Sequence, residues 1–172
     1  EKADQYNDPG FIENDPIQIP HRFSVKQDIE IAGFLTATIS WGNRKSIIKS
    51  AEKILDIMGN SPYDFVMNYS EKDLDYIKDK SIHRTFNGED FAYFIKQFNK
   101  IYKENASLEN LFLINENENN FQHSIERFRQ SFLGIEKHRT HKHVSSPYKN
   151  SSSKRIIMFL RWMIRKDNRG VD

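Results

Sequence analysis

The feature that most constrains the fold of this chain is the recurrence of apolar residues at helical spacing. Between Arg44 and Met58 the apolar positions follow the i, i+3, i+4, i+7 pattern of an amphipathic helix. Between Phe91 and Tyr102 a mainly aromatic stripe repeats at the same spacing, which is typical of a helix that faces a core. We found no stretch in which apolar and polar residues alternate as in a strand. The sequence therefore predicts an all-α fold.

Start and stop signals place the remaining expected helices. Ser24 with Gln27 is a capping-box signature before an apolar stretch at 29–39, and Gly42 can end that helix in a left-handed conformation. The stretch is apolar nearly all round, which indicates a central, buried helix. Similar signals predict short helices that begin at Ser61-Pro62 and at Ser70 with Asp73, a short helix at 107–114, a helix at 121–132 ended by Gly134, and a last helix at 151–165.

Residues 1–23 contain three prolines and no periodicity, so we expect an extended N-terminal segment there. Residues 24–172 are expected to form a single multi-helix globular domain, because a chain of 172 residues can bury one core. No cysteine is present, which excludes disulfides and thiolate metal sites. No apolar run approaches the roughly 20 residues that span a bilayer. We expect a cytoplasmic protein that has no membrane segment and no organic cofactor.

Charge is divided unevenly along the chain. Residues 1–136 hold 16 Lys and Arg against 22 Asp and Glu, a net charge of −6, whereas residues 137–172 hold 10 against 2, a net charge of +8. An acidic body, 24–136 within the domain, is thus followed by a basic loop and helix at 137–172. This segregation raises the potential felt by a polyanion and indicates DNA as the partner. The alternative is a basic tail that only aids solubility.

Three histidines of the basic loop, His138, His141 and His143, could in principle bind a metal. Only Glu136 stands nearby as a carboxylate ligand, and the surrounding cations would oppose a bound cation. We expect no metal site here.

The last expected helix presents a cationic face. At 100° per residue, Lys154, Arg161 and Arg165 fall within a stripe of roughly 40°. Asn150, Ser151 or Ser152 can cap this helix, and Lys154 then lies in or near its first turn, where the helix dipole destabilises an ammonium. Such a lysine is either an amine nucleophile or a phosphate contact, and the pattern alone favours the phosphate contact.

Several stretches resemble an uncharacterised bacterial family of unknown function. They are Asp15-Pro16-Ile17 with Pro20-His21-Arg22-Phe23, the segment IAGFLTATISWGNRK at 31–45, His83-Arg84-Thr85-Phe86-Asn87, and NSSSKRIIMFLRWMIRK at 150–166. The family is in turn distantly similar to the helix-hairpin-helix DNA glycosylases of the archaeal 8-oxoguanine type. Two features carry this second step: the Ser40-Trp41-Gly42-Asn43 end of the early helix, and Ser153-Lys154 at the start of the last one.

This resemblance implies a base-excision repair function with named residues. The loop after the early helix would place Gly42, Asn43 and Arg44 beside DNA, and Lys154 would attack the sugar C1′ of a flipped nucleotide as the catalytic nucleophile. The other nucleic-acid contacts expected are Lys149, Asn150, Ser151, Arg155, Arg161 and Arg165. The turn at 148–152 departs from the glycine-rich hairpin of these enzymes.

In the family, a segment that holds the catalytic aspartate follows the part matched here. We therefore expect the intact protein to be a DNA glycosylase/AP lyase and this chain to be an inactive fragment, incomplete at its C-terminus. Two alternatives stay open: a noncatalytic helical nucleic-acid-binding module, and a protein-interaction domain. The sequence does not fix the base lesion, the choice of DNA or RNA, or the oligomeric state.

Overall fold

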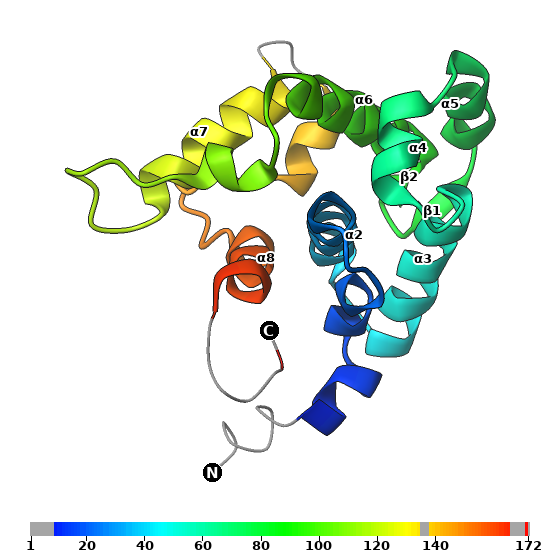
Figure 1. Ribbon diagram of the computed structural model, residues 1–172, viewed down its shortest axis with the longest axis horizontal. Helices are drawn as coiled ribbons and strands as arrows, with labels where there is room; N and C mark the ends of the chain where they lie inside the picture. The colour runs from blue at the N-terminus through cyan, green and yellow to red at the C-terminus, as the bar shows by residue number, and fades with distance from the viewer. Residues whose placement is uncertain (1–8, 135–137, 166–170, 172) are drawn as a thin grey trace.

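The computed structural model describes residues 9–134, 138–165 and 171. The fold is all-α, as predicted, and is built around α2 (Lys26–Ile39), which lies at the centre of the molecule in Figure 1. Ten consecutive residues of α2, from Glu30 to Ile39, are buried, and this confirms the expected central helix. The helices that surround α2 are α3 (Arg44–Ile57), α4 (Pro62–Asn68), α5 (Glu71–Lys78), α6 (Gly88–Glu104), α7 (Gln122–Leu133) and α8 (Lys154–Ile164).

Local capping signals explain where several of these helices begin and end. Ser70 and Asp73 form the predicted capping box of α5, each side chain accepting a hydrogen bond from the other's backbone N–H. Asn43 caps α3 through its side-chain oxygen, which accepts from Lys45 N. At the C-terminus of α7, Gly134 has φ +66°, the left-handed conformation that ends a helix and favours glycine.

The core is a cluster of phenylalanine rings from α2, α6, α7 and α8. Phe34 of α2 stands at its centre and contacts five other rings at centroid distances of 5.2 to 5.9 Å. These rings belong to Phe94, Phe98, Phe128, Phe132 and Phe159. The aromatic stripe of α6 is therefore core, as the sequence indicated.

The N-terminal part differs from the extended segment that we expected. It forms three short 3-10 helices, η1 (Pro9–Asn14), η2 (Pro16–Gln18) and η3 (Pro20–Arg22). Proline opens each of them, because its fixed φ suits the first turn of a helix. Ile17 and Ile19 are buried, so this part packs on the domain.

Other local predictions were also wrong. Ser24 and Gln27 do not form a capping box, since α2 begins after Val25 without a side-chain cap. The loop that follows α5 contains a small antiparallel hairpin, β1 (Ser81–His83) and β2 (Phe86–Asn87), which is too short to show alternation in a sequence. By contrast, the short helix expected at 107–114 is present as the 3-10 helix η4 (Leu108–Phe112), with Ser107 as its N-cap. The basic loop, where no helix was expected, contains the 3-10 helix η5 (Arg139–His143).

None of the helices that the structure describes combines the length and the apolar character needed to cross a bilayer.

Candidate functional site

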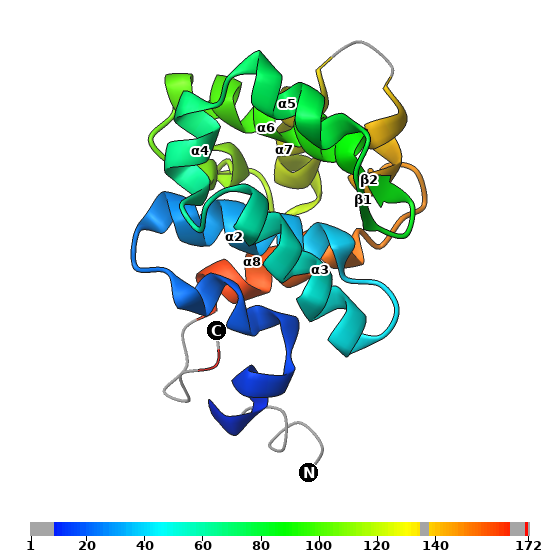
Figure 2. The same ribbon diagram turned by 90° about the vertical axis from the view of Figure 1, so that its right-hand side faces the viewer.

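Helices α2 and α8 lie side by side and antiparallel, so the end of α2 meets the start of α8 (Figure 2). Arg155, in the first turn of α8, donates from Nη1 to Thr38 O near the end of α2 at 2.9 Å. Further along α8, Phe159 and Met163 approach Gly33 in the middle of α2. This pairing brings the loop after α2 and the turn before α8 to the same end of the molecule.

The loop after α2 is held in a defined conformation. Ser40 Oγ donates to Thr36 O at 2.7 Å, which ties the start of the loop to the last turn of α2. Gly42 has φ +108°, and a Cβ at this position would lie 2.5 Å from Nη2 of Arg84. The tip of the β1–β2 hairpin therefore rests on Gly42, and Arg84 joins the predicted loop as an exposed cation.

Trp41 anchors this loop through a buried histidine. His83 lies between Ser50 Oγ, 2.9 Å from its Nδ1, and the carbonyl oxygen of Trp41, 3.1 Å from its Nε2. The Trp41 ring packs edge-to-face on His83 and stacks with His143, and the Arg155 guanidinium lies 5.0 Å from its centroid. The loop is thus fixed to α3, to the hairpin and to α8 at once.

The turn before α8 has an unusual backbone. Asn150 and Ser153 have φ values of +53° and +45°, and Ser153 precedes α8 without a side-chain cap. The cap that we expected from Asn150, Ser151 or Ser152 is therefore absent, although Ser151 Oγ accepts from Ser153 N at 3.1 Å. Left-handed non-glycine residues cost of order 1 kcal/mol and cluster at functional sites.

We call the surface that these segments share the basic end. Its cations come from the loop after α2, the hairpin tip and the turn before α8: Arg44, Arg84, Lys149 and Lys154, all exposed. Gly42, Asn43 and Asn150 are exposed beside them, and Ser151 is half-buried. Arg44 also contacts Asp15, at 3.6 Å, and the ring of Phe11. The structure therefore places the predicted loop and the predicted turn on one surface.

Three of the predicted binding residues do not belong to the basic end. Arg155 points inward to α2, and burial lowers the pKa of its guanidinium, so it ties two helices together. Arg161 and Arg165 follow Lys154 by about 10 and 16 Å along the α8 axis, at 1.5 Å per residue. The cationic stripe on α8 therefore runs away from the loop after α2.

The three histidines of the basic loop do not gather around a common point. His138 stacks on Tyr93 at a centroid distance of 4.3 Å, His141 Nε2 lies 3.2 Å from Leu133 O, and His143 is buried beside Asp90. Among the described residues no group of three or more His, Cys, Asp or Glu side chains could hold a metal ion.

A buried polar cluster around Asp90 was missed by the sequence reasoning. Asp90 is fully buried and accepts from Thr140 Oγ1 at 3.0 Å and from Arg139 Nη1 at 2.7 Å. His143 Nε2 lies 3.1 Å from Asp90 Oδ2, so the buried imidazole faces the carboxylate directly. Burial favours a higher pKa of Asp90, but its contacts with His143, Asn87 and Thr140 outweigh burial and lower that pKa.

Asn87 and Asp90 stand three residues apart and form the capping box of α6. This spacing was the available signal for Asp90, but no local pattern indicated the partners that η5 supplies. The cluster connects η5 to α6 and so fixes part of the basic loop.

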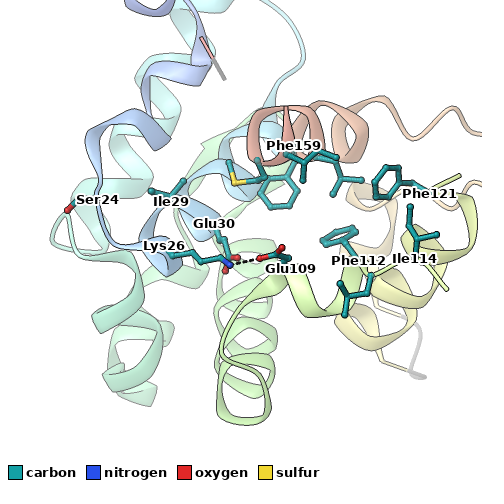
Figure 3. A pocket seen from close by; sticks show the side chains of 13 residues that line it. Ser24, Lys26, Ile29, Glu30, Glu109, Phe112, Ile114, Phe121 and Phe159 are labelled. Atoms are coloured by element: carbon teal, nitrogen blue, oxygen red, sulfur yellow. Dashed lines mark hydrogen bonds and ion pairs between the residues drawn. The ribbon is translucent and has the colours of Figure 1, made fainter. Parts of the chain in front are cut away.

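The structure also contains a separate apolar pocket of about 610 Å³ between α2, η4 and α8 (Figure 3). Phe112, Phe121 and Phe159 line its apolar side, and Lys26, Glu30 and Glu109 lie together at its polar corner. Lys26 donates to Glu109, and this hydrogen bond raises the pKa of Lys26. No sequence pattern indicated this pocket, because its walls come from three distant segments.

The described part of the chain thus defines an all-α domain with a basic end and a separate apolar pocket. A family model described as "Protein of unknown function (DUF2400)" matches residues 15–172, so the chain belongs to this family. The match confirms the resemblance to an uncharacterised family. Comparisons with curated proteins and with solved structures gave no significant match.

The more distant similarity to helix-hairpin-helix DNA glycosylases stays a prediction. Residues 134–153 separate α7 from α8, and in their described part η5 is the helix that precedes the turn.

Proposed function

We propose that this protein binds nucleic acid through the basic end. The observation that carries the proposal is the convergence of exposed cations from three separate segments, which α2 and α8 bring together by their antiparallel packing. Cations that contact phosphates supply most of the affinity of proteins for nucleic acid. DNA is the partner that the family resemblance favours.

The charges in the first helical turns support an anionic ligand at this end. Both α3 and α8 begin here, and their first turns hold cations, Arg44 with Lys45 and Lys154 with Arg155, and no acidic residue. The positive end of a helix dipole disfavours such cations by roughly 0.3–1 kcal/mol each. By contrast, α5 and α6 carry acidic residues in their first turns. A bound phosphate would offset the repulsion in α3 and α8.

Asn43 and Arg84 are the candidates for contacts beyond the phosphates. Both are exposed. Because Gly42 has no Cβ, the Arg84 guanidinium lies directly over the backbone of the loop after α2. A guanidinium can make paired hydrogen bonds to a base edge, whereas the Asn43 amide offers its Nδ2 donor, because its oxygen already accepts from Lys45 N. We assign them to base contact and assign Lys149 to phosphate contact.

Binding can be tested by fluorescence anisotropy with a duplex that contains an abasic-site analogue, across a salt series. We expect the logarithm of the binding constant to fall linearly with the logarithm of salt concentration. Lys149→Glu and Arg84→Glu should each weaken binding by about 1 kcal/mol or more and reduce the salt slope by about one. Lys72→Glu on α5 makes the same charge change as Lys149→Glu and should leave binding nearly unchanged. Equal loss in Lys72→Glu would refute a localised interface.

A finer proposal concerns Lys154 as an amine nucleophile. Its ammonium forms no hydrogen bond or ion pair with the described residues, and it stands at the start of α8 on the basic end. After losing a proton, the amine can add to the C1′ aldehyde of an opened abasic site, and loss of water then gives an imine. This step needs no base to leave, so it does not require a residue that breaks the glycosidic bond.

Sodium borohydride trapping on an abasic-site duplex tests this proposal. We expect a covalent adduct with the wild-type chain and none with Lys154→Arg, which keeps the charge and therefore keeps most of the binding. An adduct that survives in Lys154→Arg would exclude the role of Lys154. Binding without any adduct would leave a noncatalytic nucleic-acid-binding module.

A further inference from the structure

The pocket between α2, η4 and α8 lies apart from the basic end. It is lined by the first turns of α2, at Lys26 and Glu30, and by the last turns of α8, at Leu160 and Ile164. Because α2 and α8 are antiparallel, these turns stand at the opposite end of the helix pair from Lys154. We propose that this pocket binds a small amphiphile with an apolar body and a protonated amine head. The proposal is independent of nucleic-acid binding.

The apolar side of the pocket suits the body of such a ligand. Its volume of about 610 Å³ lies within the roughly 300–1,000 Å³ typical of small-molecule sites. Phe112, Phe121 and Phe159 supply aromatic walls, and Met163 adds a flexible thioether that adapts to irregular shapes. Burial of an alkyl chain or a ring against these walls provides the hydrophobic part of the affinity.

The polar corner contains a buried carboxylate that has only neutral partners. Glu30 is 4% exposed and accepts hydrogen bonds from Tyr102 Oη at 2.8 Å, Leu108 N at 2.9 Å and Ser107 Oγ. No described cation forms an ion pair with Glu30. A carboxylate has about four acceptor positions. One position therefore remains, and the buried charge lacks a counterion that a ligand ammonium could provide.

The sign of the ligand charge follows from the groups at this corner. Lys26 is the one cation among the described residues that line the pocket, and its ammonium is bonded to Glu109. Among the described groups at this corner, two carboxylates, Glu30 and Glu109, accompany the single ammonium of Lys26. A carboxylate head would be repelled by two like charges at short range, whereas an ammonium would be attracted to both. Figure 3 shows the three side chains together at the edge of the apolar walls.

A series of ligands with one apolar body and three head groups tests this inference: octylamine, octanol and octanoate. Affinities are measured by isothermal titration calorimetry, and ¹³C-methyl NMR of Met163 reports whether the ligand enters the pocket. We expect octylamine to bind at least tenfold more tightly than octanoate, to exceed octanol, and to shift the Met163 methyl signal.

Variants of the two exposed residues at the corner separate charge from folding. Glu109→Gln should weaken octylamine binding several-fold, and Lys26→Gln should strengthen it because a competing cation is removed. Lys72→Gln on α5 is the control for a lost surface charge and should have no effect. Glu30 itself is a poorer test, because its hydrogen bonds also connect α2 to α6 and η4.

Four results would overturn the proposal. Equal affinity for all three ligands would mean that the pocket selects only apolar surface, and binding without a Met163 shift would place the ligand elsewhere. The third is that octylamine does not bind up to its solubility limit. The fourth is that the Glu109→Gln and Lys26→Gln variants bind octylamine with the same affinity as the wild type.

Discussion

The position of Phe34 at the centre of the aromatic cluster predicts an unusually large cost for its replacement. Phe34 and Phe91 are both almost fully buried, at 1% and 0% exposure, but Phe34 contacts five rings and Phe91 contacts no ring among the described residues. Phe34→Leu and Phe91→Leu make the same chemical change at equal burial. The two substitutions therefore lose a similar free energy of transfer, and the difference between their effects on the free energy of unfolding isolates the contribution of the aromatic contacts.

The size of this difference follows from the number of ring pairs. Each aromatic pair contributes about 0.5–1.5 kcal/mol beyond the burial of area. The five pairs share one ring, and leucine restores part of the packing, so they do not add. We expect Phe34→Leu to lower the free energy of unfolding by about 1–2 kcal/mol more than Phe91→Leu. That corresponds to a Tm difference of roughly 2–8 °C for a domain of this size.

Urea denaturation followed by circular dichroism at 222 nm measures both variants against the wild type. The slopes of the transitions must agree for the free energies to be compared. Equal destabilisation by the two substitutions would show that ring contacts add nothing beyond burial, and the reasoning on the aromatic cluster would fail.

Two further predictions concern the segments around α6. Gly88→Ala should lower the free energy of unfolding by about 3 kcal/mol or more, because a Cβ there would lie 1.7 Å from the backbone oxygen of Ile77. Gly59→Ala should lower it by only about 1 kcal/mol, because Gly59 has a left-handed φ of +61° but no atom near its Cβ position. Thermal unfolding of the two variants measures this difference. Asp90 has a folded-state pKa below its unfolded value of 3.8, so its charge stabilises the fold above about pH 4, and this contribution is lost as the pH falls through the lowered pKa. The unfolding free energy of Asp90→Asn should therefore fall less steeply than that of the wild type below about pH 4, and parallel curves would contradict this role.

The antiparallel packing of α2 and α8 is the feature on which the functional proposals depend. It places the basic end and the apolar pocket at opposite ends of one helix pair. If nucleic acid binds at the basic end and an amine binds in the apolar pocket, a substitution that abolishes one binding activity should leave the other intact.

The sequence by itself determined the features that depend on neighbours in the chain. The spacing in α3 and α6, the capping box of α5 and the glycine after α7 are local patterns, because a helix is set by residues three and four apart and by the groups at its ends. The sequence also predicted the buried character of α2, and it indicated the candidate site segments at 42–44 and 149–154. These segments needed only composition and resemblance to be identified.

Only the tertiary structure decided which of the predicted site residues meet. Arg155 and Lys154 are adjacent in the sequence, but packing against Thr38 turns the first inward and leaves the second exposed. Arg84 lies on the basic end, and Arg161 and Arg165 lie away from it, because the position of each depends on a hairpin or a helix axis that no local pattern specifies. The pocket has the same origin, since its walls come from segments more than 70 residues apart at Glu30 and Glu109. Contacts between distant segments form only when the whole chain packs, and the sequence around each residue does not record them.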